Sequence, residues 1–213
     1  MIFKKGDTLL MTGDSVTDCG RSEEGESVKN SVAGLGSGYP ALVKAYLNAF
    51  YPELDLRIIN KGISGNRTPD ILARMEKDHL SLKPDVVTVL IGVNDVWRHF
   101  DRPNERQVEP DEYEANLTGI VEKLKTSARA VYVLTPFLVK KDDGHPMYAM
   151  VQEYREIAKR VAEKTGAACI DLQKTYDKQI ENADPTLYSA DTVHPTICGH
   201  MVIARELIRE FTK

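Results

Sequence analysis

Four short segments of the 213-residue chain carry the residue types that acyl transfer requires. The segments are Gly13-Asp14-Ser15, Asn60–Asn66, Gly92–Asp95 and Asp191–His194. A serine hydroxyl becomes a nucleophile when a neighbouring base takes its proton, and histidine is the usual base. Glycine backbone amides and asparagine side-chain amides can donate hydrogen bonds to an oxyanion. The segments therefore contain a nucleophile, a base, an acid to orient that base, and oxyanion donors.

Each segment taken alone has a simpler structural explanation. Ser15 in a lone Gly-Asp-Ser tripeptide is typical of a helix N-cap. Gly65 suits a turn, and Asn94 next to an aspartate suits an Asx turn. His194, directly before a proline, suits a surface position, and Asp191 suits a helix cap. Chemistry is indicated only if the fold brings the four segments to one place.

Short apolar runs alternate along the chain with longer amphipathic segments, and this alternation predicts where the segments lie. The predicted strands are Thr8–Thr12, Leu56–Asn60, Val86–Ile91, Ala130–Leu134 and Ala168–Asp171. The predicted helices are Pro40–Tyr51, Thr68–Ser81, Pro110–Ser127, Tyr148–Thr165 and Thr196–Phe211. Strands separated by helices form parallel sheets covered on both faces. We therefore predict an α/β fold in one domain, residues 1–213, a three-layer α/β/α sandwich around about five parallel strands.

Three of the four segments follow predicted strands, and the fourth enters the last predicted helix. Ligands of such sheets bind beyond the carboxyl ends of the strands. We predict that Ser15 is the nucleophile, that His194 is its base, and that Asp191 orients the imidazole. The backbone amides of Ser15 and Gly65 and the side-chain amide of Asn94 are the predicted oxyanion hole. The Gly-x-Ser-x-Gly turn of α/β-hydrolases is absent.

In this order, the four segments resemble the sequence blocks of the SGNH hydrolases, the GDSL lipase/esterase family. The resemblance implies that Ser15, Gly65, Asn94 and His194 are the four residues for which that family is named, and that Asp191 completes a triad. It also implies a flavodoxin-like three-layer fold and an esterase without a metal or an organic cofactor.

Longer stretches resemble a bacterial subgroup described as acetylxylan esterases, which are often intracellular. The stretches are GDSVTDCGR, GLGSGYPALV, INKGISGNRTPDI, IGVNDVWR and DTVHPTICGHMVIAR. This resemblance implies removal of acetyl groups from imported xylo-oligosaccharides. Two alternatives stay open: a lysophospholipase or thioesterase with the same triad, and a catalytically inactive binding module.

Composition and charge limit the classes of binding partner that we expect. The net charge is −4 and no basic run occurs, so we expect neither nucleic acid nor an anionic membrane surface as a partner. The first residues, MIFKKGDTLL, lack the apolar core of a secretory signal, and three scattered cysteines are not a disulfide framework. We expect a cytoplasmic protein whose partner is a small acetylated sugar. Homo-oligomerisation stays open.

Two further sets of residues have competing interpretations. Asp191, His194, Cys198 and His200 contain metal-ligand types, but a closed zinc site needs paired ligand spacings that a proline and a helix start interrupt here. We expect no metal, and we expect Cys198 to be a small buried residue. Trp97, three residues after Asn94, suits a core or oligomer contact as well as sugar stacking, so it is a candidate substrate-binding residue.

Overall fold

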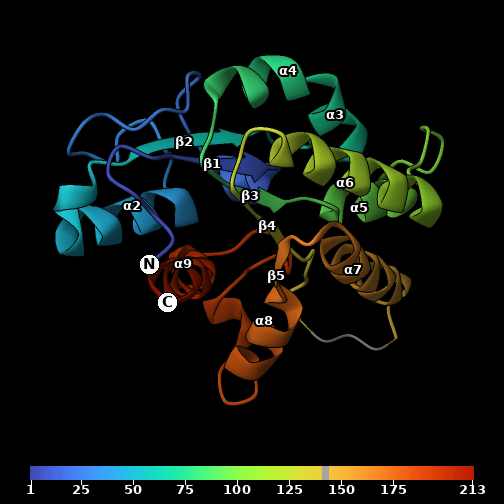
Figure 1. The fold of residues 1–213 in the computed structure, drawn as a ribbon. Coiled ribbons are helices and arrows are strands. Elements are labelled where there is room, and N and C mark those ends of the chain that lie inside the picture. The colour runs from blue at the N-terminus through green and yellow to red at the C-terminus, as the bar shows by residue number, and fades with distance from the viewer. Residues whose placement is uncertain (141–143) are drawn as a thin grey trace.

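The computed structural model describes residues 1–140 and 144–213, and these form a parallel sheet between two layers of helices (Figure 1). The strands are β1 (Thr8–Gly13), β2 (Arg57–Gly62), β3 (Val86–Leu90), β4 (Ala130–Leu134) and β5 (Ala168–Ile170). Their order across the sheet is β2-β1-β3-β4-β5, and every neighbouring pair is parallel. The predicted three-layer α/β/α fold and all of its strands are confirmed.

The helices divide between the two faces of the sheet (Figure 1). One face is covered by α2 (Tyr39–Phe50), α8 (Leu172–Ile180) and α9 (Ile197–Thr212). The other is covered by α3 (Thr68–Ala73), α4 (Met75–Asp78), α5 (Val93–Asp101), α6 (Pro110–Lys125) and α7 (Pro146–Thr165). A short helix, α1 (Ser15–Asp18), follows β1, and three 3₁₀ turns span Pro52–Leu54, Leu80–Leu82 and Pro185–Leu187.

Burial of β1 and β3 explains why their sequences are apolar along most of their length. Every residue of both strands is buried, because both of their faces carry helices and both of their edges carry neighbouring strands. The edge strand β5 is different, since Ala168 and Cys169 are exposed. In the part of the chain that the structure describes, no helix has the length and apolarity needed to cross a bilayer.

The prediction of one helix over Thr68–Ser81 is wrong, because the chain leaves helical geometry twice in that range. Arg74 separates α3 from α4, and its guanidinium turns inward to donate to Asn66 Oδ1 at 2.9 Å. His79 ends α4 and is fully buried, with Nε2 2.8 Å from Thr12 Oγ1. The helix is therefore interrupted at the two residues, Arg74 and His79, whose side chains form polar contacts with the loop after β2 and with β1. The helices α5 and α8 were not predicted, since each is only nine residues long.

A fully buried asparagine joins the end of β2 to α1. The Asn60 side chain donates to the carbonyl oxygens of Thr17 at 2.7 Å and Leu35 at 2.9 Å. Its Oδ1 accepts from the backbone N–H of Gly62 at 2.9 Å. One side chain therefore forms hydrogen bonds with backbone groups of three segments. It fixes α1, which begins at Ser15, against the neighbouring strand.

We expect Asn60→Ala to lower the free energy of unfolding by about 2–4 kcal/mol, because buried backbone groups without partners cost about 1–3 kcal/mol each. Urea unfolding followed by circular dichroism measures the loss. The exposed Asn104→Ala serves as the control and should change stability by no more than about 0.5 kcal/mol. A loss for Asn60→Ala that is as small as the control's would contradict a positioning role for this amide.

Candidate active site

Ser15 is the first residue of α1, directly beyond the end of β1. The cap of this helix is Asp14, whose Oδ1 accepts from the Val16 N–H at 3.0 Å. The interpretation of Ser15 as the cap is therefore wrong, since the preceding residue occupies that position. The Ser15 hydroxyl instead lies 2.9 Å from Nε2 of His194.

The imidazole of His194 connects Ser15 to Asp191. Its Nδ1 is 2.6 Å from Asp191 Oδ2. A carboxylate only accepts hydrogen bonds, so Nδ1 carries the proton and Nε2 is left to accept from the serine hydroxyl. The three side chains that the sequence predicted as a triad therefore form one continuous hydrogen-bonded chain.

The loop that carries the acid and the histidine is shaped by the acid itself. Asp191 Oδ1 accepts from the backbone N–H groups of Val193 at 3.0 Å and His194 at 2.7 Å. Burial acts to raise the pKa of Asp191, but the hydrogen bonds from His194 and Val193 outweigh it and hold that pKa below its usual value. Asp191 is thus an anion at neutral pH, as a partner for an imidazolium must be.

Two of the predicted oxyanion donors, Gly65 and Asn94, follow the strands on either side of β1. Gly13 pairs with Gly62 of β2 and with Leu90 of β3, so the loops after both strands flank Ser15. Gly65 lies in the loop after β2 with φ +82°, a conformation that favours glycine. Asp18 holds this loop, because it accepts from the N–H of Ser64 at 3.0 Å.

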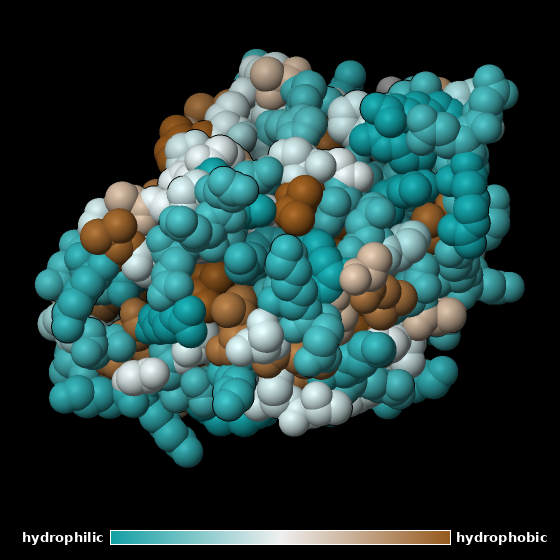
Figure 2. All heavy atoms as spheres, turned by 90° about the horizontal axis from the view of Figure 1, so that it is seen from above, coloured by the Kyte–Doolittle hydropathy of each residue, from teal (hydrophilic) through white to brown (hydrophobic). Residues whose placement is uncertain are grey.

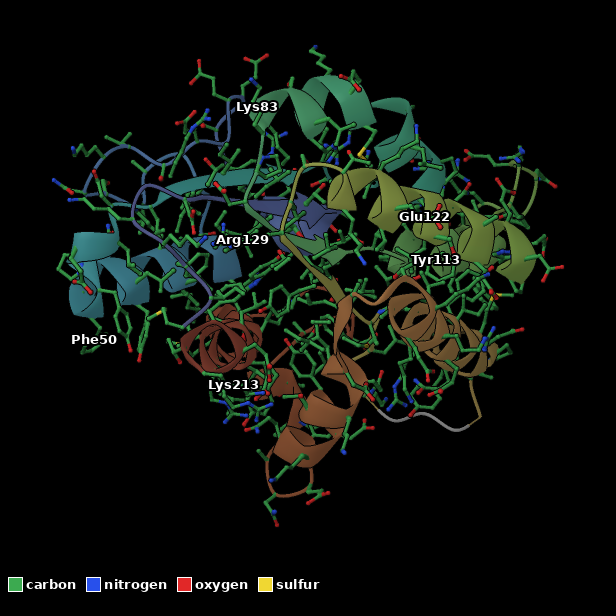
Figure 3. All side chains as sticks on the ribbon, viewed as in Figure 1. Phe50, Lys83, Tyr113, Glu122, Arg129 and Lys213 are labelled. Atoms are coloured by element: carbon green, nitrogen blue, oxygen red, sulfur yellow. The ribbon has the colours of Figure 1, made fainter. Side chains whose placement is uncertain are left out.

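Asn94 lies in the first turn of α5, after β3, and is 2 % exposed. Its Nδ2 donates to the carbonyl oxygen of Asn66 at 3.2 Å. The helix begins after Gly92, which has φ +132°, and a Cβ there would lie 2.7 Å from the Tyr113 hydroxyl. Tyr113 belongs to α6 (Figure 3), and its hydroxyl donates to the carbonyl oxygen of Ile91, directly after β3, at 3.0 Å. A glycine is therefore required before the asparagine.

Two buried carboxyl groups lie next to these residues. Asp14 is 1 % exposed, and burial raises its pKa to about 7. Asp95 is fully buried, and burial raises its pKa to about 6, although hydrogen bonds from the Thr68 N–H and hydroxyl oppose the rise. The charge of Asp95 further raises the pKa of Asp14, so this carboxyl retains its proton at higher pH than usual.

We expect Asp14→Asn to become more stable relative to the native protein as pH rises. The folded protein retains a proton on Asp14 up to a pKa of about 7, whereas the unfolded chain releases it near its ordinary value of about 4. Between these values the folded state binds more protons, so its free energy of unfolding falls as pH rises. The asparagine keeps the acceptor for Val16 and has no such dependence.

Urea unfolding at about pH 4.5 and about pH 7.5 tests this linkage. Asp14→Asn should gain stability relative to the native protein at the higher pH, and Asp111→Asn, at an exposed position, controls for loss of a surface charge. The same difference at both pH values would contradict the buried proton on Asp14.

A cavity of about 370 Å³ opens beside Asp191. It is lined by aromatic and aliphatic side chains together with a few polar ones, among them Trp97, Phe100, Leu138, Lys140, Tyr148 and Thr192. The Trp97 ring lies 5.9 Å from the His194 ring, centroid to centroid. The predicted substrate-binding candidate is therefore part of a cavity that adjoins the histidine.

The four residues considered as metal ligands do not converge. His200 Nδ1 accepts from the Tyr39 N–H at 3.2 Å, and its Nε2 lies 3.4 Å from Cys19 Sγ. Across residues 1–140 and 144–213, no group of three or more histidine, cysteine, aspartate or glutamate side chains is placed to hold a metal ion. The prediction that Cys198 is buried is wrong, because it lies on the outer side of α9, next to the exposed Ile197.

Three residues that contact the segments of the site were not predicted from the sequence: Asp18, Asn60 and Arg98. Asp18 and Asn60 act through backbone groups of distant segments, for which the sequence contains no pattern. Arg98 donates to Asn94 Oδ1 at 3.0 Å, and its spacing of four residues from Asn94 is the one available signal. A spacing of four residues is informative only where a helix is predicted, and no helix was predicted at α5.

Comparison with known proteins agrees with this geometry. Residues 11–202 match the model of the GDSL-like Lipase/Acylhydrolase family. The chain is 42 % identical over 213 residues to the acetylxylan esterase of Geobacillus stearothermophilus, covering 99 % of this chain and 96 % of that protein. The crystal structure of Axe2, an acetylxylan esterase from Geobacillus stearothermophilus, superposes with a TM-score of 0.93 at 41 % identity, over 99 % of this chain and 96 % of that one.

A second solved structure extends the comparison. LAE5, an alpha/beta hydrolase from the metagenome of Lake Arreo in Spain, has a TM-score of 0.93 at 38 % identity, over 100 % of this chain and 98 % of that one. The fold, the family match and the extent of the identity agree with each other. The chain therefore belongs to the GDSL-like lipase/acylhydrolase family and is a carboxylic ester hydrolase.

Proposed function

We propose that this protein removes acetyl groups from acetylated carbohydrates, with xylo-oligosaccharides as the substrate class, through an acyl-enzyme on Ser15. The observation that carries the proposal is the hydrogen-bonded chain from Ser15 through His194 to Asp191 beside a partly aromatic cavity. The name of the 42 % identical relative, acetylxylan esterase, supports the choice of substrate.

The reaction follows from the placement of the protons. Ser15 Oγ attacks the acetyl carbonyl carbon while His194 Nε2 takes the hydroxyl proton, and Asp191 stabilises the imidazolium that forms. Negative charge develops on the carbonyl oxygen, where the amides of Ser15, Gly65 and Asn94 would donate. The imidazolium then protonates the leaving sugar oxygen. A water molecule, activated by the same imidazole, hydrolyses the acetyl-serine and releases acetate.

The volumes of two cavities are consistent with a substrate that has a small acyl group and a larger alcohol. The cavity beside Trp97 has a volume in the range of small-molecule sites, about 300–1,000 Å³. A separate apolar cavity between Val16 and Phe137, which also borders Asp14, has only about 10 Å³. We assign the sugar to the cavity beside Trp97. The cavity next to Val16 has no room for a long acyl chain.

The lipid-ester alternative has less support. On the face shown in Figure 2, apolar residues form small separate patches among hydrophilic ones, whereas enzymes that dock on lipid surfaces need a continuous apolar face. A cytoplasmic location, a single domain and homo-oligomerisation stay predictions.

We expect Ser15→Ala to keep the fold and to lose at least about 10³-fold in kcat on 4-nitrophenyl acetate, as loss of a triad nucleophile does. Circular dichroism checks the fold, and labelling by a fluorophosphonate should disappear with the hydroxyl. Ser81→Ala, at an exposed serine, is the matched control. Residual activity within about tenfold of the native rate would remove Ser15 from the nucleophile's role.

We expect kcat/KM to fall steeply from 4-nitrophenyl acetate to the butyrate and the octanoate, because the cavity of about 10 Å³ next to Val16 has no room for added methylenes. Acetate release from acetylated xylobiose, measured in parallel, tests the sugar half of the proposal. If octanoate were the best ester and the sugars released no acetate, the lipid or thioester alternative would replace the carbohydrate one.

A further inference from the structure

We propose that Arg98 is a positioning residue that fixes the side-chain amide of Asn94 with its N–H groups toward the oxyanion and strengthens them as donors. The inference rests on the proposed function, in which Asn94 is an oxyanion donor. It extends the site to a residue that touches neither the substrate nor the triad.

The hydrogen bonds around Asn94 determine which way its amide faces. Arg98 Nη2 donates to Asn94 Oδ1 at 3.0 Å, and Asn94 Nδ2 donates to the carbonyl oxygen of Asn66 at 3.2 Å. A guanidinium only donates and a carbonyl oxygen only accepts. Both contacts therefore require the same orientation of the amide. The second N–H of Nδ2 is left for the substrate oxygen.

The opposite orientation would be harmful to the reaction. Rotation of the amide by half a turn would present Oδ1, an acceptor, to an oxygen on which negative charge develops. The guanidinium prevents this, because Oδ1 would lose a charge-assisted hydrogen bond at a side chain that is 2 % exposed. A cation bonded to Oδ1 also polarises the amide, which makes Nδ2–H a stronger donor.

Arg98 is itself held in place by its own helix. Asn94 and Arg98 are four residues apart on α5, so their side chains meet on one face. The guanidinium also forms an ion pair with Asp101, and its central carbon lies 5.6 Å from the centroid of the Trp97 ring. The Arg98 side chain is 14 % exposed. The guanidinium therefore has a defined location between the oxyanion donor and the ring that packs on His194.

A positioning role predicts a loss in kcat with little change in KM, because the oxyanion exists only in the transition state. We expect Arg98→Met, which keeps an apolar stem against Trp97, to lower kcat on 4-nitrophenyl acetate by about 10- to 100-fold, less than the 10²–10³-fold typical of deleting a donor. Arg98→Lys retains the charge and should recover part of the loss. Arg102→Met, at an exposed arginine that contacts Glu105, is the control and should keep the native kcat.

A double-mutant cycle with Asn94→Ala separates this role from a general structural one. Arg98→Met should lose its effect on kcat when Asn94 is already alanine, since no amide is left to orient. Equal losses in both backgrounds, or a loss only in KM, would overturn the inference and leave the proposed function intact.

The outcomes for Asn94→Ala alone identify a failure of the proposed function. If kcat were unchanged in that variant, Asn94 would not be an oxyanion donor, and both the hole and the role of Arg98 would be wrong. If Arg98→Met did not fold, the same cycle with Arg98→Lys would decide, because the partial loss expected for lysine must also vanish in the Asn94→Ala background.

Discussion

The parallel register of β1 against β2 and β3 determines where the reacting groups stand. Gly13 lies opposite Gly62 on one side and Leu90 on the other, so three chain segments leave the sheet at the same level. The proposed nucleophile follows β1, and a candidate oxyanion donor follows each of its two neighbouring strands. A shift of any one strand would separate a donor from Ser15. The apolar packing on both faces therefore also serves the chemistry.

Polar side chains hold these exits together. Asn60, Asp14 and Asp95 are buried at or near the carboxyl ends of β2, β1 and β3, where burial of a polar group costs free energy unless hydrogen bonds compensate it. Each accepts or donates hydrogen bonds that fix a backbone segment: Asn60 fixes α1, Asp14 caps it, and Asp95 holds the start of α3. Buried hydrogen bonds are directional, so they define one arrangement of the loops, which nonpolar packing alone does not do.

The sheet and the residues of the proposed triad could be predicted from the sequence, whereas the side chains that tether the loops could not. Strands such as Val86–Leu90 are recognisable because burial on both faces demands apolar, β-branched residues. Ser15, Asp191 and His194 are recognisable because acyl transfer needs their chemical types. The tethers Asp18 and Asn60 bond to backbone groups far away in sequence, so their roles appear only when the segments are seen in space.

The groups proposed to perform the chemistry and the residues that shape the cavity come only partly from the same elements. The proposed nucleophile and the candidate oxyanion donors follow β1, β2 and β3, whereas the cavity beside His194 is lined from α5, from the segment after β4, from the start of α7 and from the loop that carries Asp191. Both Asn94, a candidate oxyanion donor, and Trp97, which lines the cavity, lie on α5, so this helix connects the proposed chemistry to the cavity. A change in the position of α5 would consequently alter the cavity and the candidate oxyanion donor together.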